Sequence, residues 1–139
     1  MSGVELVFVT KKELFDRYGL FDEKFKVCED YELWLRIASK IKIGYLDKPL
    51  IKKHGGHKGQ LSEKYWGIDR YRIKALEKVL INDNLKDQQK LKVLEYLLNK
   101  INIILLGAIN RKNKRIFNMY IKKKFIWLNY NYNVKNKNN

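Results

Sequence analysis

The chain has 139 residues, of which 45% are hydrophobic and 32% charged, a composition that can bury a core and excludes a wholly disordered or collagen-like protein. Thirty lysine and arginine residues against fifteen acids give a net charge of +15, which favours an anionic partner such as nucleic acid, a membrane surface or a phosphorylated ligand. The single cysteine, Cys28, excludes an internal disulfide and a cysteine-built zinc site, and it fits a reducing, cytoplasmic compartment.

The beginning of the chain alternates between strand and helix patterns. β-Branched and aromatic residues predict a strand over residues 3–9. Thr10 and Glu13 fit a capping box, in which each side chain accepts a hydrogen bond from the other residue's backbone, so a short helix is expected to follow Thr10. Gly19 is expected to end this helix.

A second helix is expected to begin near Glu29 and Asp30, because acids suit the positive end of a helix dipole. Its apolar residues recur at spacings of three and four, which predicts one buried face. These residues are Leu33, Trp34, Ile37, Ala38 and Ile41. A strand over 41–46, a turn at 47–49 and a glycine-rich loop over 54–59 are predicted to follow.

From Ser62 onward the patterns are helical, with a break at 82–84. A strong amphipathic stripe follows, with spacings of three and four. Its members are Leu91, Leu94, Leu98, Ile101, Leu105 and Ala108. A further helix is predicted to end near Trp127. The last eleven residues, 129–139, are rich in asparagine and lysine and are expected to be disordered.

The predicted order is strand, helix, helix, strand and loop, followed only by helices. We therefore expect an α/β segment over residues 1–62, a helical extension over 63–128 and the disordered tail over 129–139. At most three short strands cannot form a protected sheet alone, so their edges need a partner. The partner would be a separate N-terminal half or a second copy of the chain.

Neither a membrane span nor a signal peptide is expected. The longest apolar run, residues 103–109, is far shorter than the roughly 20 residues of a span, and the N-terminal segment lacks a long apolar core.

No acid follows Glu95. Within this basic region, the three lysines 122–124 stand beside Phe125, Ile126 and Trp127, a pattern typical of a segment that lies on a membrane surface. The alternative is an ordinary solvated face of a lysine-rich protein.

Four segments resemble motifs of family 2 glycosyltransferases, in the family's order. Residues 3–25 resemble the stretch that ends in Gly-x-Phe-Asp-Glu-x-Phe, and Glu29–Arg36 (EDYELWLR) resembles the motif ED-x-(D/E)-LWLR. Residues 43–50 resemble the strand that follows. Residues 57–62 resemble the loop H-x-G-S-x-S, with Gln60 in place of a small polar residue. Together the resemblance covers roughly residues 2–81.

The resemblance implies the GT-A fold, a single α/β domain whose first half binds the nucleotide and carries an Asp-x-Asp metal motif. The chain contains no Asp-x-Asp sequence. It therefore resembles the acceptor-binding half followed by a helical extension. A divalent metal, Mn²⁺ or Mg²⁺, would be held mainly by the nucleotide-binding half, and the isolated chain is expected to be inactive or weakly active.

The resemblance assigns the catalytic base to Asp30, because a sugar hydroxyl becomes a good nucleophile only as its proton is removed. Glu29 would orient the acceptor or the adjacent loop. Without the resemblance, both acids are explained by the preference of helix N-termini for negative charge. Both interpretations stay open from the sequence.

His57, Gly59 and Ser62 are the candidate residues on the donor side, toward the nucleotide. By the resemblance His57 lies near the diphosphate and is the candidate metal ligand, while Gly59 lets backbone N–H groups approach phosphate. Two histidines alone do not make a metal site, so an ordinary loop is the alternative.

Trp34 and Arg36 are the candidate acceptor contacts. An indole ring that faced the cleft would stack on a sugar, but core packing explains Trp34 as well, since it lies on the apolar face of its helix. Arg36 would brace the acids through a salt bridge or remain solvated.

The function expected from these residues is inverting transfer of a sugar from a nucleotide diphosphosugar to a hydroxyl of a glycan or lipid-linked acceptor. The expected place is the cytoplasm, with peripheral contact at the inner face of the membrane. The alternative is a non-enzymatic basic module that binds nucleic acid, an anionic membrane or a protein, although no motif for specific nucleic-acid recognition is present.

Overall fold

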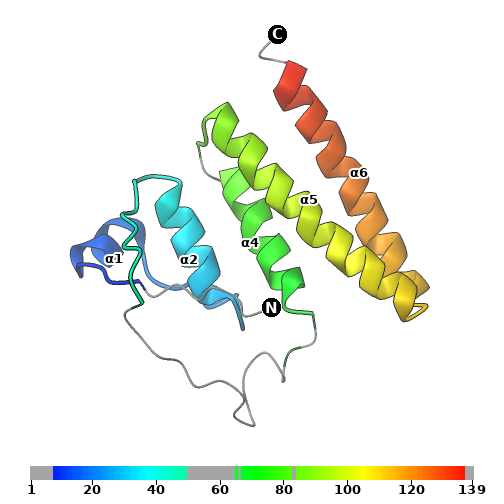
Figure 1. The fold of residues 1–139 in the computed structure, drawn as a ribbon, viewed down its shortest axis with the longest axis horizontal. Coiled ribbons are helices and arrows are strands. Elements are labelled where there is room, and N and C mark those ends of the chain that lie inside the picture. Colours follow the sequence, from blue (N-terminus) through cyan, green and yellow to red (C-terminus); the bar gives the residue numbers. More distant parts are fainter. Residues whose placement is uncertain (1–7, 50–64, 66, 83, 137–139) are drawn as a thin grey trace.

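A computed structural model describes residues 8–49, 65, 67–82 and 84–136, and these residues form five helices. The helices are α1 (Glu13–Tyr18), α2 (Glu29–Ala38), α4 (Asp69–Asn82), α5 (Asp87–Asn110) and α6 (Lys114–Asn136). The three long helices α4, α5 and α6 pack side by side, and α2 packs on α4 away from α6 (Figure 1). The helix that carries the site, α2, therefore packs against one edge of the helical bundle.

The predicted α/β, GT-A-like fold class is wrong for the described residues, because none of them forms a strand. The strand predicted over 41–46 is an irregular segment that leaves Ile43, Tyr45 and Leu46 exposed. A strand needs a neighbour that takes up its backbone N–H and C=O groups, and no described segment pairs with this one. Phe8 and Val9 are likewise outside regular structure, and residues 3–7 lie outside the described residues.

The first two helices begin close to the predicted places, but for different reasons. The capping box is absent: Lys12 is the N-cap of α1, and the Thr10 hydroxyl donates instead to the carbonyl of Lys11 at 3.5 Å. Gly19 does end α1, with a positive φ of 82° that glycine adopts without strain. The predicted start of α2 at Glu29 is confirmed.

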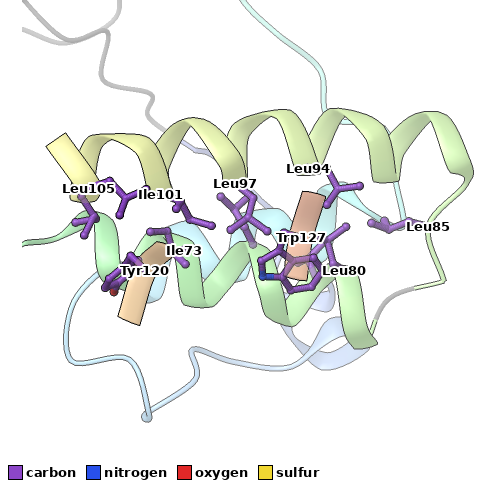
Figure 2. Packing of buried hydrophobic residues seen from close by; sticks show 12 residues of the cluster. Ile73, Leu80, Leu85, Leu94, Leu97, Ile101, Leu105, Tyr120 and Trp127 are labelled. Atoms are coloured by element: carbon purple, nitrogen blue, oxygen red, sulfur yellow. The ribbon is translucent and has the colours of Figure 1, made fainter. Parts of the chain in front are cut away.

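The core of the bundle is built around α5 (Figure 2). Four members of the predicted stripe are buried, namely Leu94, Ile101, Leu105 and Ala108. Leu91 and Leu98 lie only at the edge, while Leu97 and Ile104 are buried. The stripe is displaced because α5 packs against both α4 and α6, so its buried face is centred between two neighbours.

The last helix, α6, is longer than predicted. Tyr120, Trp127 and Val134 recur every seven residues and are all buried, which is the spacing of one helix face. Residues 129–136, expected to be disordered, form the last turns of α6. The burial of Val134 gives these turns a hydrophobic contact that outweighs the poor helix propensity of the asparagines.

Of the described helices, α5 is the one that is long and apolar enough to cross a membrane by length and composition, with a third of its most apolar stretch buried in the bundle. No span is expected from the sequence, because charged and polar residues interrupt the apolar run. In the bundle, α5 packs against both α4 and α6. Its apolar character is thus partly explained by its place in the core.

Candidate functional site

The candidate site lies at the N-terminus of α2, where the sequence places three acids in the first turn. Asp30 is exposed, and its Oδ1 accepts a hydrogen bond from the backbone N–H of Tyr31 at 2.7 Å. Glu29 is half-buried. Neither carboxylate forms an ion pair with any cation in the described part of the chain. Both are therefore available for solvent or a ligand.

The third acid, Glu32, has the opposite environment. Its side chain is 0% exposed and lies between two cations. The Nζ of Lys78 lies 2.6 Å from Oε1, and the Arg36 guanidinium approaches Oε1 at 3.1 Å and Oε2 at 3.2 Å. A buried carboxylate held in this way serves to fix its helix, because its charge is already neutralised.

The same two cations fasten the segment between α1 and α2. Lys78 also lies 2.7 Å from Oδ2 of Asp22. Arg36 donates to the carbonyl oxygens of Tyr18 and, at 2.8 Å, Leu20. The start of α2 is therefore held by α4 on one side and by the loop after α1 on the other.

The charges of this network shift two pKa values. Hydrogen bonding from Lys78, and then from the backbone N–H of Lys24, holds the pKa of Asp22 below its ordinary value of 3.8. Burial alone would lower the pKa of Lys78, but hydrogen bonds to Asp22 and Glu32 outweigh it and raise that pKa above 10.5. Both shifts keep the groups ionised at neutral pH.

The two predicted acceptor contacts make internal interactions. The Trp34 ring stacks on Phe8 with centroids 4.1 Å apart and 14° between the planes, so one of its faces is covered. Arg36 is engaged by Glu32 and by two backbone carbonyl oxygens, as described above. The carboxylate partner of Arg36 is Glu32, and Arg36 forms no ion pair with Glu29 or Asp30 among the described residues.

The start of α4 completes the surroundings of Asp30. The Sγ of Cys28 lies 4.0 Å from the carbonyl oxygen of Ile68, which joins the two helix starts. Burial raises the pKa of the Cys28 thiol, and Arg72 and Asp30 are both among its electrostatic neighbours. Arg72 itself pairs with Asp69 at 2.9 Å. The site thus combines the exposed carboxylate of Asp30 and the half-buried carboxylate of Glu29 with the paired, 40% exposed guanidinium of Arg72.

The donor-side candidates His57, Gly59 and Ser62 lie outside the described residues, so their roles stay predictions. Within the described ranges, no group of three or more histidine, cysteine or acidic side chains could hold a metal ion. The expected divalent metal therefore has no ligand set among these residues.

The cluster of Glu32, Lys78 and Asp22 is the part of the site that sequence reasoning missed. The spacing of Glu32 and Arg36 by four residues was a readable signal for a pair within one helix. Nothing local signalled Lys78, which is 46 residues from Glu32.

No protein-family model, curated protein or solved structure matches this chain.

Proposed function

We propose that this chain supplies the acceptor side of a glycosyl transfer site, with Asp30 as the general base. The proposal is supported by the resemblance of Glu29–Arg36 to the family 2 motif and by the contrast between two acids on one helix turn. Glu32 is buried and neutralised by two cations, whereas Asp30 is exposed and carries no ion pair within the described residues. This contrast is the observation that carries the proposal.

The chemistry follows from what an exposed, directed carboxylate can do. Asp30 accepts the proton of an acceptor hydroxyl while the hydroxyl oxygen forms a bond to the anomeric carbon of the donor sugar. The bond between that carbon and the nucleoside diphosphate breaks, and attack from the opposite side inverts the configuration. The reaction requires the carboxylate form of the base, because only that form can accept the proton.

The remaining residues position the base rather than react. Glu32, Arg36 and Lys78 fix α2 against α4, so the direction of Asp30 is set by a helix that cannot easily rotate. The all-helical arrangement of the described residues differs from the α/β domain that the resemblance implied. The proposal therefore rests on the first turn of α2 and its neighbours, independently of the fold class.

The experiment separates binding of the acceptor from transfer. Purified chain is mixed with a panel of glycans and lipid-linked sugars, and binding is followed by saturation-transfer NMR. Transfer from labelled nucleotide sugars is then measured with added Mn²⁺ or Mg²⁺ and with a soluble extract of the source cells, which supplies any nucleotide-binding portion. Extract alone gives the background.

Asp30→Asn keeps the size of the side chain and removes the base, so acceptor binding is expected to persist while transfer falls about 10²- to 10⁴-fold. Asp16→Asn is the matched control, because Asp16 is also an exposed acid in the first turn of a helix. Equal transfer by the Asp30→Asn variant and the unmodified chain would refute the role of Asp30. An absence of both acceptor binding and transfer above background would refute the proposed function.

A further inference from the structure

We infer that one face of the α5–α6 pair docks on an anionic membrane surface. Six apolar side chains that the bundle leaves 38–67% exposed make up this face, which we call the apolar face. They are Ile103, Leu106 and Ile109 of α5 and Phe125, Leu128 and Tyr132 of α6. The inference rests on this surface and its charge, and it does not depend on glycosyl transfer.

The members of each half of the apolar face line up along their own helix. Phe125, Leu128 and Tyr132 follow one another at spacings of three and four, so they lie on one side of α6. The three α5 residues recur every three positions, so each lies about 60° round the helix from the next and the row runs obliquely along α5. Each helix therefore presents a continuous apolar row outside the core.

The two rows lie on the same side of the helix pair. The two helices run antiparallel and side by side (Figure 1). At one end, a surface hollow is lined by Asn99 of α5 and by Asn131 and Lys135 of α6. Asn99 lies one turn before Ile103, and the two α6 residues lie three positions after Leu128 and Tyr132. At the other end, Ile109 shares a hollow with Phe117, two turns before Phe125. From these two hollows we infer that the apolar rows face the same side of the helix pair.

The charge around the apolar face selects the partner. No acid follows Glu95, and Lys124 and Lys135 lie within one turn of the α6 row. If a second copy of the chain covered the apolar face, the lysines of the two copies would repel each other. Against anionic lipid headgroups they gain attraction while the apolar side chains enter the acyl boundary, and tyrosine suits the headgroup level. Charge complementarity therefore favours a membrane over self-association.

The structure also corrects the sequence-based choice of interfacial residues. Trp127 points into the bundle, and its Nε1 donates to Glu77 at 2.8 Å. Lys123 pairs with the same carboxylate at 2.6 Å. These two residues of the basic, aromatic segment belong to the core and its border. Of the three apolar residues that the sequence pattern named, Phe125 lies on the apolar face, and Leu128 is the residue beside it that the pattern did not name.

Vesicle flotation tests the inference with the intact chain. Phosphatidylcholine vesicles that contain phosphatidylglycerol are compared with pure phosphatidylcholine vesicles at low and high salt. We expect the chain to float with the anionic vesicles and to be released partly by salt. The double variant Phe125→Ser/Leu128→Ser keeps every charge and is expected to bind the anionic vesicles roughly tenfold less well, because the lost groups are those that enter the lipid.

Ile126→Ser is the matched control. Ile126 is 64% exposed and apolar, but it projects from α6 about 100° round from Phe125, so its loss is expected to leave flotation unchanged. The melting temperatures of all variants establish that they are folded, which is expected because the substituted side chains lie outside the core.

Three outcomes would overturn the inference. The first is that the chain does not float with anionic vesicles. The second is that the double variant floats like the unmodified chain, which would mean that net charge alone drives binding. The third is that light scattering finds a dimer that the double variant dissociates, because the apolar face would then be covered by a second copy.

Discussion

The ammonium group of Lys78 lies 2.6 Å from Oε1 of Glu32, and this contact joins α4 to the helix that carries the candidate base. Glu32 is fully buried, so its charge must be compensated within the protein. Lys78 and Arg36 supply that compensation. The orientation of the exposed Asp30, two residues before Glu32, therefore depends on a contact made 46 residues later in the chain.

Replacing Glu32 by alanine should destabilise the chain strongly. The substitution removes the shared carboxylate and leaves Lys78 and Arg36 partly buried without it, a change that costs about 3–5 kcal/mol in comparable buried pairs. Urea unfolding measures the difference in free energy. Glu23→Ala is the control, because Glu23 is an exposed acid in the preceding loop, and its effect should be within about 0.5 kcal/mol. Similar losses for the two variants would show that the Glu32 network contributes little.

The stability of the chain should fall as the solution is acidified through the pKa of Asp22. That pKa is below 3.8 in the folded state, because Lys78 and the Lys24 backbone N–H stabilise the charged carboxylate. The unfolded state consequently takes up a proton first, and the stabilisation present above pH 3.8 is lost as the pH drops through the folded-state value.

The raised pKa of Lys78 makes stability depend on pH in the opposite direction. Its contribution to the free energy of unfolding is present below pH 10.5 and is lost as the pH rises through the folded-state pKa. Urea unfolding at a series of pH values measures both limbs. The Asp22→Asn variant should show a shallower acid limb than the unmodified chain. An unchanged acid limb in that variant would mean that other carboxylates account for the pH dependence.

Replacing Trp127 by phenylalanine should weaken the attachment of α6 to α4. Phenylalanine keeps an aromatic ring in the core, but it cannot donate the 2.8 Å hydrogen bond to the Glu77 carboxylate. Hydrogen bonds to charged groups contribute about 1.5–3 kcal/mol, and part of this should be retained because Lys123 still pairs with Glu77. In a Glu77→Gln background, the same substitution should cost less, and an equal cost in both backgrounds would assign the loss to ring packing alone.

Local patterns were sufficient to predict most of the helices. The acids at Glu29 and Asp30 marked the start of α2, the break at 82–84 separated α4 from α5, and the spacing of Leu94, Ile101 and Leu105 marked the buried side of α5. These features depend on helix dipoles and on a period of 3.6 residues, both of which act over a few neighbouring positions. For this reason the helix starts, the break and the buried face can be predicted from the sequence.

The failures share a physical cause, which is dependence on distant segments. The segment 41–46 has strand-forming residues, yet a strand exists only with a partner, and no described segment pairs with it. The turns after residue 128 looked polar enough to be disordered, but the burial of Val134 stabilises them as helix. Propensity alone could not anticipate either result.

The sequence by itself determined the helical periodicity, the basic second half and the position of Asp30 in a first helical turn, because each follows from composition or local spacing. Only the tertiary structure decided that Glu32 is buried between Arg36 and Lys78 while Asp30 stays exposed. It also decided that Trp127 faces the core while Phe125 faces outward. These outcomes depend on which helices become neighbours, a property of packing that no short stretch of sequence encodes.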